Sequence, residues 1–186
     1  MDRYVDIRIL PDPEFPPEQL MNALFAKLHR ILVRLRTDDI GISFPGVDPA
    51  KPRFGRILRL HGTQDSLSRL LHEQWLTGMN DHVRVGVVEP VPAQVEHRRV
   101  RRVQAKSNVE RIRRRQMKRH QWSEEEAKER IPDSTEKTLS LPFLSIGSAS
   151  TGNRFRLFID HKASPGPSTG KFNGYGLSDS ATVPWF

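Results

Sequence analysis

Apolar and polar residues alternate with two different periods in the first half of the chain. Val5, Ile7 and Ile9 are separated by polar residues, which is the two-residue period of a half-buried strand. Residues 18–36 instead carry apolar side chains at helical spacing, and Pro17 suits the first turn of such a helix. The pattern therefore predicts a strand followed by a long amphipathic helix.

Four further segments complete the first predicted domain. Three read as strands and one as a short helix; the strands are 40–44, 56–62 and 82–92, and the helix runs from Asp65 to about Leu76. The resulting order is strand–helix–strand–strand–helix–strand. That order predicts a ferredoxin-like domain over 1–94, an arrangement shared with RNA-recognition (RRM-like) domains.

The sequence changes character after residue 94. Segment 98–120 holds eleven arginines and lysines against one acid, and a helix is expected at about 108–120. A second helix is expected at 123–130, because Ser123 and Glu126 stand at capping-box spacing. Strand-like runs follow in 135–160. The whole chain is therefore predicted to be α+β, with a C-terminal α+β domain over 95–186 that contains an arginine-rich helix.

The net charge indicates which class of partner the protein binds. The formal net charge is +8, which suggests a polyanionic partner, with nucleic acid first and an acidic membrane surface second. The chain has no cysteine, no signal-peptide pattern at its start and no apolar run long enough to span a membrane. We expect a soluble cytoplasmic protein that does not bind membranes.

The basic segment has three interpretations: a solvated helix face, a disordered tail or a nucleic-acid surface. On a helix, Arg111, Arg115, Lys118 and Arg119 fall within roughly 100° of arc, with Arg114 beside them. A solvated face normally mixes acids with bases, and this one does not. The pattern favours nucleic acid.

An extended backbone just before this helix would present a pair of base-reading side chains. Arg102 and Gln104 would then point the same way, where arginine suits a guanine edge and glutamine an adenine edge. The alternative is two ordinary polar surface residues.

Candidates for chemistry are few. His29 lies just off the edge of the apolar stripe of the first helix, and imidazole exchanges protons near neutral pH; the alternative is an ordinary boundary histidine. Ser148 and Ser150 lie in a turn-like segment, and Tyr175 stands between two glycines that allow close backbone approach. Phe155 belongs to a core face, or stacks on a base if it lies at an exposed strand end.

Metal and cofactor chemistry has no motif to support it. The chain lacks HExxH, a cysteine site and a P-loop, so we expect no metal and no cofactor. If the protein cleaves RNA, the simplest reaction uses the RNA's own 2′-hydroxyl, with proton transfer by a side chain.

Several long, irregular strings resemble one family over nearly the whole chain. They are "MDRYVDIRILPDPEFPPEQLM", "LFAKLH", "RVQAKSN", "ERIRRRQMKRH", "SEEEAKERIPD", "STGNRFRLFI", "YGLS" and "VPWF". Together they are similar to the CRISPR RNA-processing endoribonucleases of the type I-F (Ypest) system. The resemblance implies metal-independent cleavage of precursor RNA at the base of the repeat stem-loop by 2′-hydroxyl attack, leaving a 2′,3′-cyclic phosphate or 3′-phosphate end. It also implies that the enzyme stays bound to the mature guide RNA beside other subunits of a guide-RNA surveillance complex.

The same resemblance implies roles for particular residues. His29 matches the proton-transfer histidine, Ser148 the serine that orients the 2′-hydroxyl with Ser150 close by, and Tyr175 a tyrosine that positions His29. The remaining matches concern RNA binding: Arg102 and Gln104 as base readers, and Phe155 as the aromatic that stacks on the terminal base pair. Arg114, Arg115 and Arg119 match the helix that lies in the groove, and Lys118 stands where the family can carry another arginine. We also expect Lys106, Asn108 and Arg111 to bind RNA. Without the resemblance, a non-catalytic protein that binds structured RNA explains the charge equally well.

Overall fold

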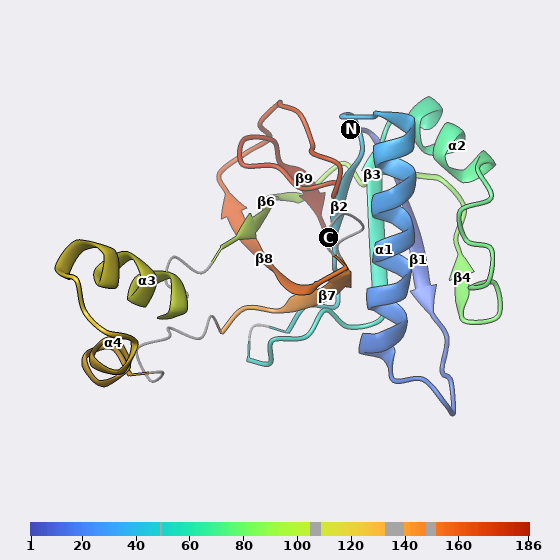
Figure 1. The fold of residues 1–186 in the computed structure, drawn as a ribbon. Coiled ribbons are helices and arrows are strands. Elements are labelled where there is room, and N and C mark those ends of the chain that lie inside the picture. The colour runs from blue at the N-terminus through green and yellow to red at the C-terminus, as the bar shows by residue number, and fades with distance from the viewer. Residues whose placement is uncertain (49, 105–108, 133–139, 148–151) are drawn as a thin grey trace. The chain divides into compact units, whose positions relative to one another are not determined.

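The computed structural model describes every residue except 49, 105–108, 133–139 and 148–151, and leaves out the side chains of Glu110 and Arg111. The described residues form four helices and two sheets whose strand pairs are antiparallel (Figure 1). The predicted α+β class is therefore confirmed.

The first sheet is built from the N-terminal half of the chain. Its elements are β1 (Arg3–Ile9), α1 (Pro17–Leu35), β2 (Gly41–Ser43), β3 (Ile57–Gly62), α2 (Gln64–His72), β4 (Val83–Val85) and β5 (Glu89–Pro90). The strand order is β2-β3-β1-β4. β5 also pairs with β1, at Arg3 and Tyr4, whereas β4 pairs with the end of β1 near Ile9. Two short strands thus stand where the sequence predicted one strand over 82–92, and α2 ends at His72 rather than near Leu76.

Alternation along β1 places its apolar side chains on one face. Val5 and Ile7 lie opposite Leu60 and Leu58 of β3, and all four are fully buried. The apolar stripe of α1 belongs to the same core, and Pro17 occupies the first turn of that helix as predicted. The long helix is therefore held by packing against the sheet along most of its length, which fixes the residues at the edge of its stripe.

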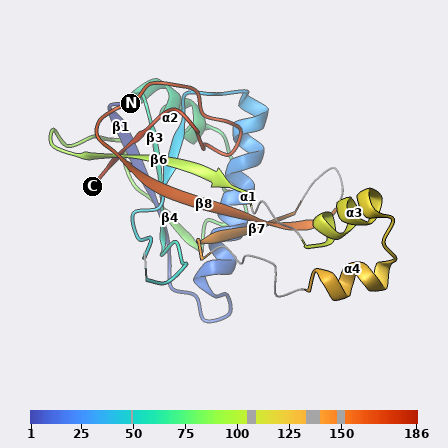
Figure 2. The same cartoon turned by 90° about the vertical axis from the view of Figure 1, so that its left-hand side faces the viewer.

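A second sheet is formed by strands from the C-terminal half together with a strand inside the basic segment. Its strands are β6 (Glu96–Val103), β7 (Phe143–Gly147), β8 (Arg154–Ser164) and β9 (Val183–Trp185), in the order β7-β8-β6-β9. Figure 2 shows β6, β7 and β8 of this sheet. One face buries Val100, Leu157 and Ile159 in the common core. β7 also packs against α1, where the backbone N–H of Ser145 donates to Oδ1 of Asn22 at 2.9 Å.

The remaining helices are α3 (Val109–His120) and α4 (Glu124–Arg130). Ser123 and Glu126 form the predicted capping box at the start of α4. The guanidinium of Arg113 donates twice to the backbone oxygen of Ile131, at 2.8 and 2.6 Å, and so ties α3 to the end of α4. One arginine of the basic helix is therefore used in folding.

Residue contacts divide the chain into two compact units. One unit joins residues 1–103 to 141–186, and the other is 104–140, which contains α3 and α4. The two sheets separate near residue 94 in the sequence but belong to the same unit. The predicted domains, 1–94 and 95–186, stay a prediction. Within the described parts of the chain, no helix is both long and apolar enough to cross a membrane.

Candidate active site and nucleic-acid interface

His29 is held on α1 with one ring nitrogen bonded and in a defined tautomer. Its Nδ1 lies 2.7 Å from the backbone oxygen of Gly174, 145 residues away in the sequence. A carbonyl oxygen only accepts hydrogen bonds, so Nδ1 must carry the proton. In the neutral ring the lone pair then lies on Nε2. A half-buried histidine with this tautomer can accept a proton at Nε2.

Tyr175 fixes the plane of the same imidazole. The two rings are stacked, with centroids 4.1 Å apart and planes 11° from parallel. The ring of Tyr175 is also nearly parallel to that of Phe25 in the core, at a centroid distance of 6.3 Å and an angle of 4°. The histidine ring is therefore oriented by a stack that continues into the hydrophobic core.

The turn that carries Gly174 and Tyr175 is shaped by an asparagine. Oδ1 of Asn173 accepts from the backbone N–H groups of Tyr175, at 2.9 Å, and of Leu177, at 3.3 Å. Gly176 adopts a φ of +70°, which favours glycine. A Cβ on Gly174 would lie 2.9 Å from Cγ2 of Val33 and 3.8 Å from Cε1 of His29, so a side chain there would have to displace Val33 or the turn.

Asn173 was not singled out from the sequence. The glycines beside Tyr175 indicated a close backbone approach, and the structure places Gly174 against Val33 and His29 of α1 and Gly176 against Ile42 of β2. An asparagine before a glycine is a common turn signal, so Asn173 had a local signature, whereas its link to His29 is purely tertiary.

Other predicted catalytic and binding residues cannot be placed. Ser148, Ser150, Lys106 and Asn108 lie outside the described residues, and the side chain of Arg111 is likewise not described. The structure thus brings together His29 and Tyr175 of the predicted catalytic set.

Two predicted RNA-binding residues meet at one end of the second sheet. The guanidinium of Arg102, on β6, lies over the ring of Phe155, on β8, at 5.7 Å from its centroid. Phe155 is half-buried against the core and Arg102 is exposed. Gln104, just after β6, is exposed as well. Phe155 is thus both a core-edge residue and an aromatic surface beside an arginine.

The predicted basic helix carries cations with few neutralising neighbours. Four of them are exposed, namely Arg114, Arg115, Lys118 and Arg119. None of the four has a hydrogen bond or ion pair with any described residue, although α4 contributes several glutamates to the same unit. Uncompensated like charges favour binding of an anion.

Two further histidines, the buried His61 and the half-buried His161, pack against the core and do not form part of this site. Burial lowers the pKa of His61 to about 3, and nearby Arg59 adds to the effect. Burial likewise lowers the pKa of His161 to about 4, helped by the charge of Arg98. Both side chains are therefore neutral at pH 7 and serve packing, His61 beside Oγ of Ser43 at 2.8 Å and His161 against Phe44 and Trp185.

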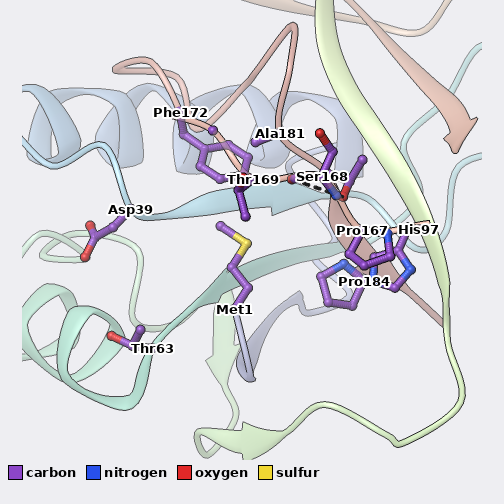
Figure 3. A pocket seen from close by; sticks show the side chains of 12 residues that line it. Met1, Asp39, Thr63, His97, Pro167, Ser168, Thr169, Phe172, Ala181 and Pro184 are labelled. Atoms are coloured by element: carbon purple, nitrogen blue, oxygen red, sulfur yellow. Dashed lines mark hydrogen bonds between the residues drawn. The ribbon is translucent and has the colours of Figure 1, made fainter.

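A pocket of about 290 Å³ lies elsewhere on the same unit (Figure 3). Its lining includes Met1, His97 and the 167–170 loop, where Ser168 and Thr182 exchange hydrogen bonds. It contains none of the predicted site residues. Nor do the histidines and carboxylates of the described residues form any group of three placed to hold a metal ion.

Comparison with known proteins identifies relatives of full length. Residues 4–186 match the family model described as "CRISPR-associated protein (Cas_Csy4)". The chain is 52% identical, over 191 aligned positions, to a protein of Pseudomonas aeruginosa (strain UCBPP-PA14) named "CRISPR-associated endonuclease Cas6/Csy4". It is 46% identical to a protein of the same name from Escherichia coli (strain UTI89 / UPEC), and both alignments cover all of each chain.

Proposed function

Because this chain belongs to the Cas_Csy4 family of CRISPR-associated proteins, we propose that it is a metal-independent endoribonuclease that matures CRISPR guide RNA. The observation that carries the proposal is the bond between Nδ1 of His29 and the Gly174 carbonyl. It leaves Nε2 as the proton acceptor that an RNA 2′-hydroxyl needs. The curated relatives are named endonucleases, which supports the enzymatic class.

The proposed reaction is a transesterification at the base of the repeat stem-loop. Nε2 of His29 takes the proton of the 2′-hydroxyl, whose oxygen attacks the adjacent phosphorus. The bond from phosphorus to the 5′-oxygen of the next nucleotide breaks, and that oxygen takes up a proton from water or from the protonated His29. The products are a 2′,3′-cyclic phosphate, which can open to a 3′-phosphate, and a 5′-hydroxyl.

The remaining catalytic residues have positioning roles in this proposal. Ser148 orients the 2′-hydroxyl, with Ser150 close by, and Tyr175 holds the imidazole in plane. The stack between Tyr175 and His29 supports the last of these roles. The reaction needs no metal ion and no cofactor.

RNA is held by a separate set of side chains. In the proposal α3 lies in the major groove of the hairpin, with Arg111, Arg114, Arg115, Lys118 and Arg119 toward phosphates, while Lys106 and Asn108 belong to the segment that leads into it. Arg102 reads a guanine, Gln104 an adenine, and Phe155 stacks on the terminal base pair. The groove of an RNA helix is normally too deep and narrow for side chains, but a short stem is open at its loop end.

The setting of the enzyme follows from the same proposal. After cleavage it stays on the mature guide RNA in the cytoplasm, beside other subunits of a type I-F surveillance complex. The first sheet is proposed to be a ferredoxin-like domain, which the order of its elements and the strand order β2-β3-β1-β4 support. The 95–186 segment is the proposed hairpin-binding domain.

A non-catalytic protein that binds structured RNA is the second candidate, because the unpaired cations of α3 support it equally well. One assay separates the two. The protein is incubated in EDTA with a repeat hairpin, and with the same hairpin bearing a 2′-deoxy sugar at the scissile nucleotide. We expect cleavage of the first and only binding of the second. An intact first RNA would favour the non-catalytic candidate, and a cut second RNA would exclude attack by the 2′-hydroxyl.

A further inference from the structure

The outer face of the second sheet carries a distinct set of side chains. In β8 the residues at even positions from 154 to 162 point away from the core, as do residues at odd positions in β6 and β7 that pair with them. We call this surface the basic sheet face and define it by seven residues. They are Arg99, Arg101, Phe143, Arg154, Arg156, Phe158 and Lys162.

Two aromatic rings occupy the middle of the basic sheet face. Phe143 and Phe158 are direct partners across β7 and β8, and their ring centroids are 5.4 Å apart. Phe143 is 39% exposed, which is unusual for phenylalanine. The guanidinium of Arg156 lies 4.8 Å from the centre of the Phe143 ring. Exposed aromatic rings on an open sheet, with arginine beside them, are a platform on which unpaired bases stack.

Cations flank the aromatic pair on both sides along the strands. Arg154 and Arg156 precede Phe158 on β8, whereas Lys162 follows it, opposite Arg99 of β6. Asp160 is the acid of this face and is paired with Arg101 at 3.2 Å. Among the described residues, the exposed Arg154 and Lys162 have no hydrogen-bond or ion-pair partner. These cations are therefore available to phosphates.

A groove beside the edge strand β7 continues the surface. It holds about 580 Å³ and is lined by Phe143 together with Arg53 and Arg56. Glu18 also lines it and lies 3.6 Å from Arg53, whereas Arg56 forms no ion pair with a described residue. A strand of RNA that crosses the sheet has space to leave along this groove.

We propose that the basic sheet face binds single-stranded RNA that flanks the repeat hairpin. The inference rests on the proposed function for the source of that RNA, but the basic sheet face is made of residues other than those of α3 and His29. Its ligand chemistry is a sugar–phosphate backbone with unstacked bases, because aromatic rings alternate with cations rather than forming a purely cationic ridge.

The test measures affinity for three RNAs that carry a 2′-deoxy sugar at the cut site. One is the bare hairpin, and the others carry single-stranded extensions of about eight nucleotides on the 5′ or the 3′ side. The variants are Arg156→Gln with Lys162→Gln, and separately Phe143→Leu. The matched control is Arg8→Gln with Arg84→Gln, two exposed arginines paired across β1 and β4 of the first sheet.

At least one extension should tighten binding to the wild-type protein, and the side that does so identifies the bound flank. The double variant Arg156→Gln with Lys162→Gln should reduce the steepness of log affinity against log salt concentration by about 1.4 for that RNA, because each phosphate contact with a single strand contributes about 0.7 to this slope. Phe143→Leu should lower the affinity for the extended RNA by about fivefold or more, because it removes an aromatic ring on which a base can stack. Neither should change affinity for the bare hairpin.

Two results would overturn the inference: no gain from either extension, or an equal loss in the Arg8/Arg84 control, which would indicate bulk charge. Failure of the proposed function is visible separately, because the hairpin without the 2′-deoxy sugar would then stay uncut in EDTA. In that event the isolated single strand, with 5-iodouridine for crosslinking, is the readout. A crosslink at Phe143 or Phe158 supports the surface, and its absence rejects it.

Discussion

The imidazole of His29 lies parallel to the ring of Tyr175, with centroids 4.1 Å apart. Together with the hydrogen bond from Nδ1 to the Gly174 carbonyl, this stack restricts both rotation and tautomer of the ring. The turn that supplies both contacts is far from α1 in the sequence. Position of the proposed general base therefore depends on a tertiary contact rather than on the helix alone.

Replacing Tyr175 tests whether the stack matters for catalysis. Tyr175→Phe keeps the aromatic face, so we expect cleavage near the wild-type rate. Tyr175→Leu removes the face, which is worth about 0.5–1.5 kcal/mol for an aromatic pair, and should slow cleavage by about three- to tenfold. Single-turnover rates at saturating protein measure the difference. Equal rates for Leu and Phe would show that the stack has no positioning role.

Gly174→Ala tests the close approach between the turn and α1. The new methyl would meet Cγ2 of Val33 at 2.9 Å and move the carbonyl that holds Nδ1, so cleavage should fall by about tenfold. Adding Val33→Ala should recover part of the loss, because it removes the clash. Gly166→Ala is the matched control, since no atom lies within 4 Å of the added carbon. The idea fails if Gly166→Ala slows the reaction as much.

The position of His29 on its helix could be predicted from the sequence, but its hydrogen-bond partner and strand β6 could not. The stripe of α1 placed His29 at the edge of the buried face, which is where the structure has it. Its partner Gly174 is 145 residues away, and no local pattern links the two. Likewise, β6 was hidden within a basic run, because Val100 is its one fully buried residue and charged side chains obscure the alternation.

In the proposal the cations of α3 supply affinity for the hairpin, whereas Gln104 after β6 sets the position of the cut, and this division can be tested. Losing Arg115 and Arg119 together should weaken hairpin binding and lower the salt slope by about 1.8, at about 0.9 for each phosphate contact. Gln104→Ala should keep most of the affinity but reduce the accuracy of the cut. Binding constants at several salt concentrations and mapped product ends measure the two effects. If Gln104→Ala weakens binding as much as the double variant, the division is wrong.

Acid should destabilise the protein through its buried histidines. His61 and His161 have their pKa lowered by burial to about 3 and about 4, from an ordinary 6.5. Below pH 6.5 both histidines bind protons in the unfolded chain but stay neutral in the folded protein. Their contribution to the free energy of unfolding is therefore complete above pH 6.5 and is lost as the pH falls toward 4 and 3. Each histidine should lower the free energy of unfolding by about 2 kcal/mol between pH 7 and pH 5.

Urea unfolding at pH 7 and pH 5 measures this loss. Ser43→Ala combined with His61→Leu removes one titrating group and its hydrogen-bond partner together, so its loss should be smaller by about 2 kcal/mol. An unchanged pH dependence would contradict the assignment. Neither histidine carried a signal in the sequence, because a polar residue within a strand pattern does not reveal which face it occupies.

The central claim is that His29 transfers the proton while other residues hold the RNA. The most direct measurement compares single-turnover cleavage of a repeat hairpin, in EDTA, by the wild-type protein and by His29→Ala, with hairpin affinity measured in parallel. We predict a rate lower by about 10²–10⁴ with unchanged affinity. A variant that cuts as fast as the wild type would contradict the claim.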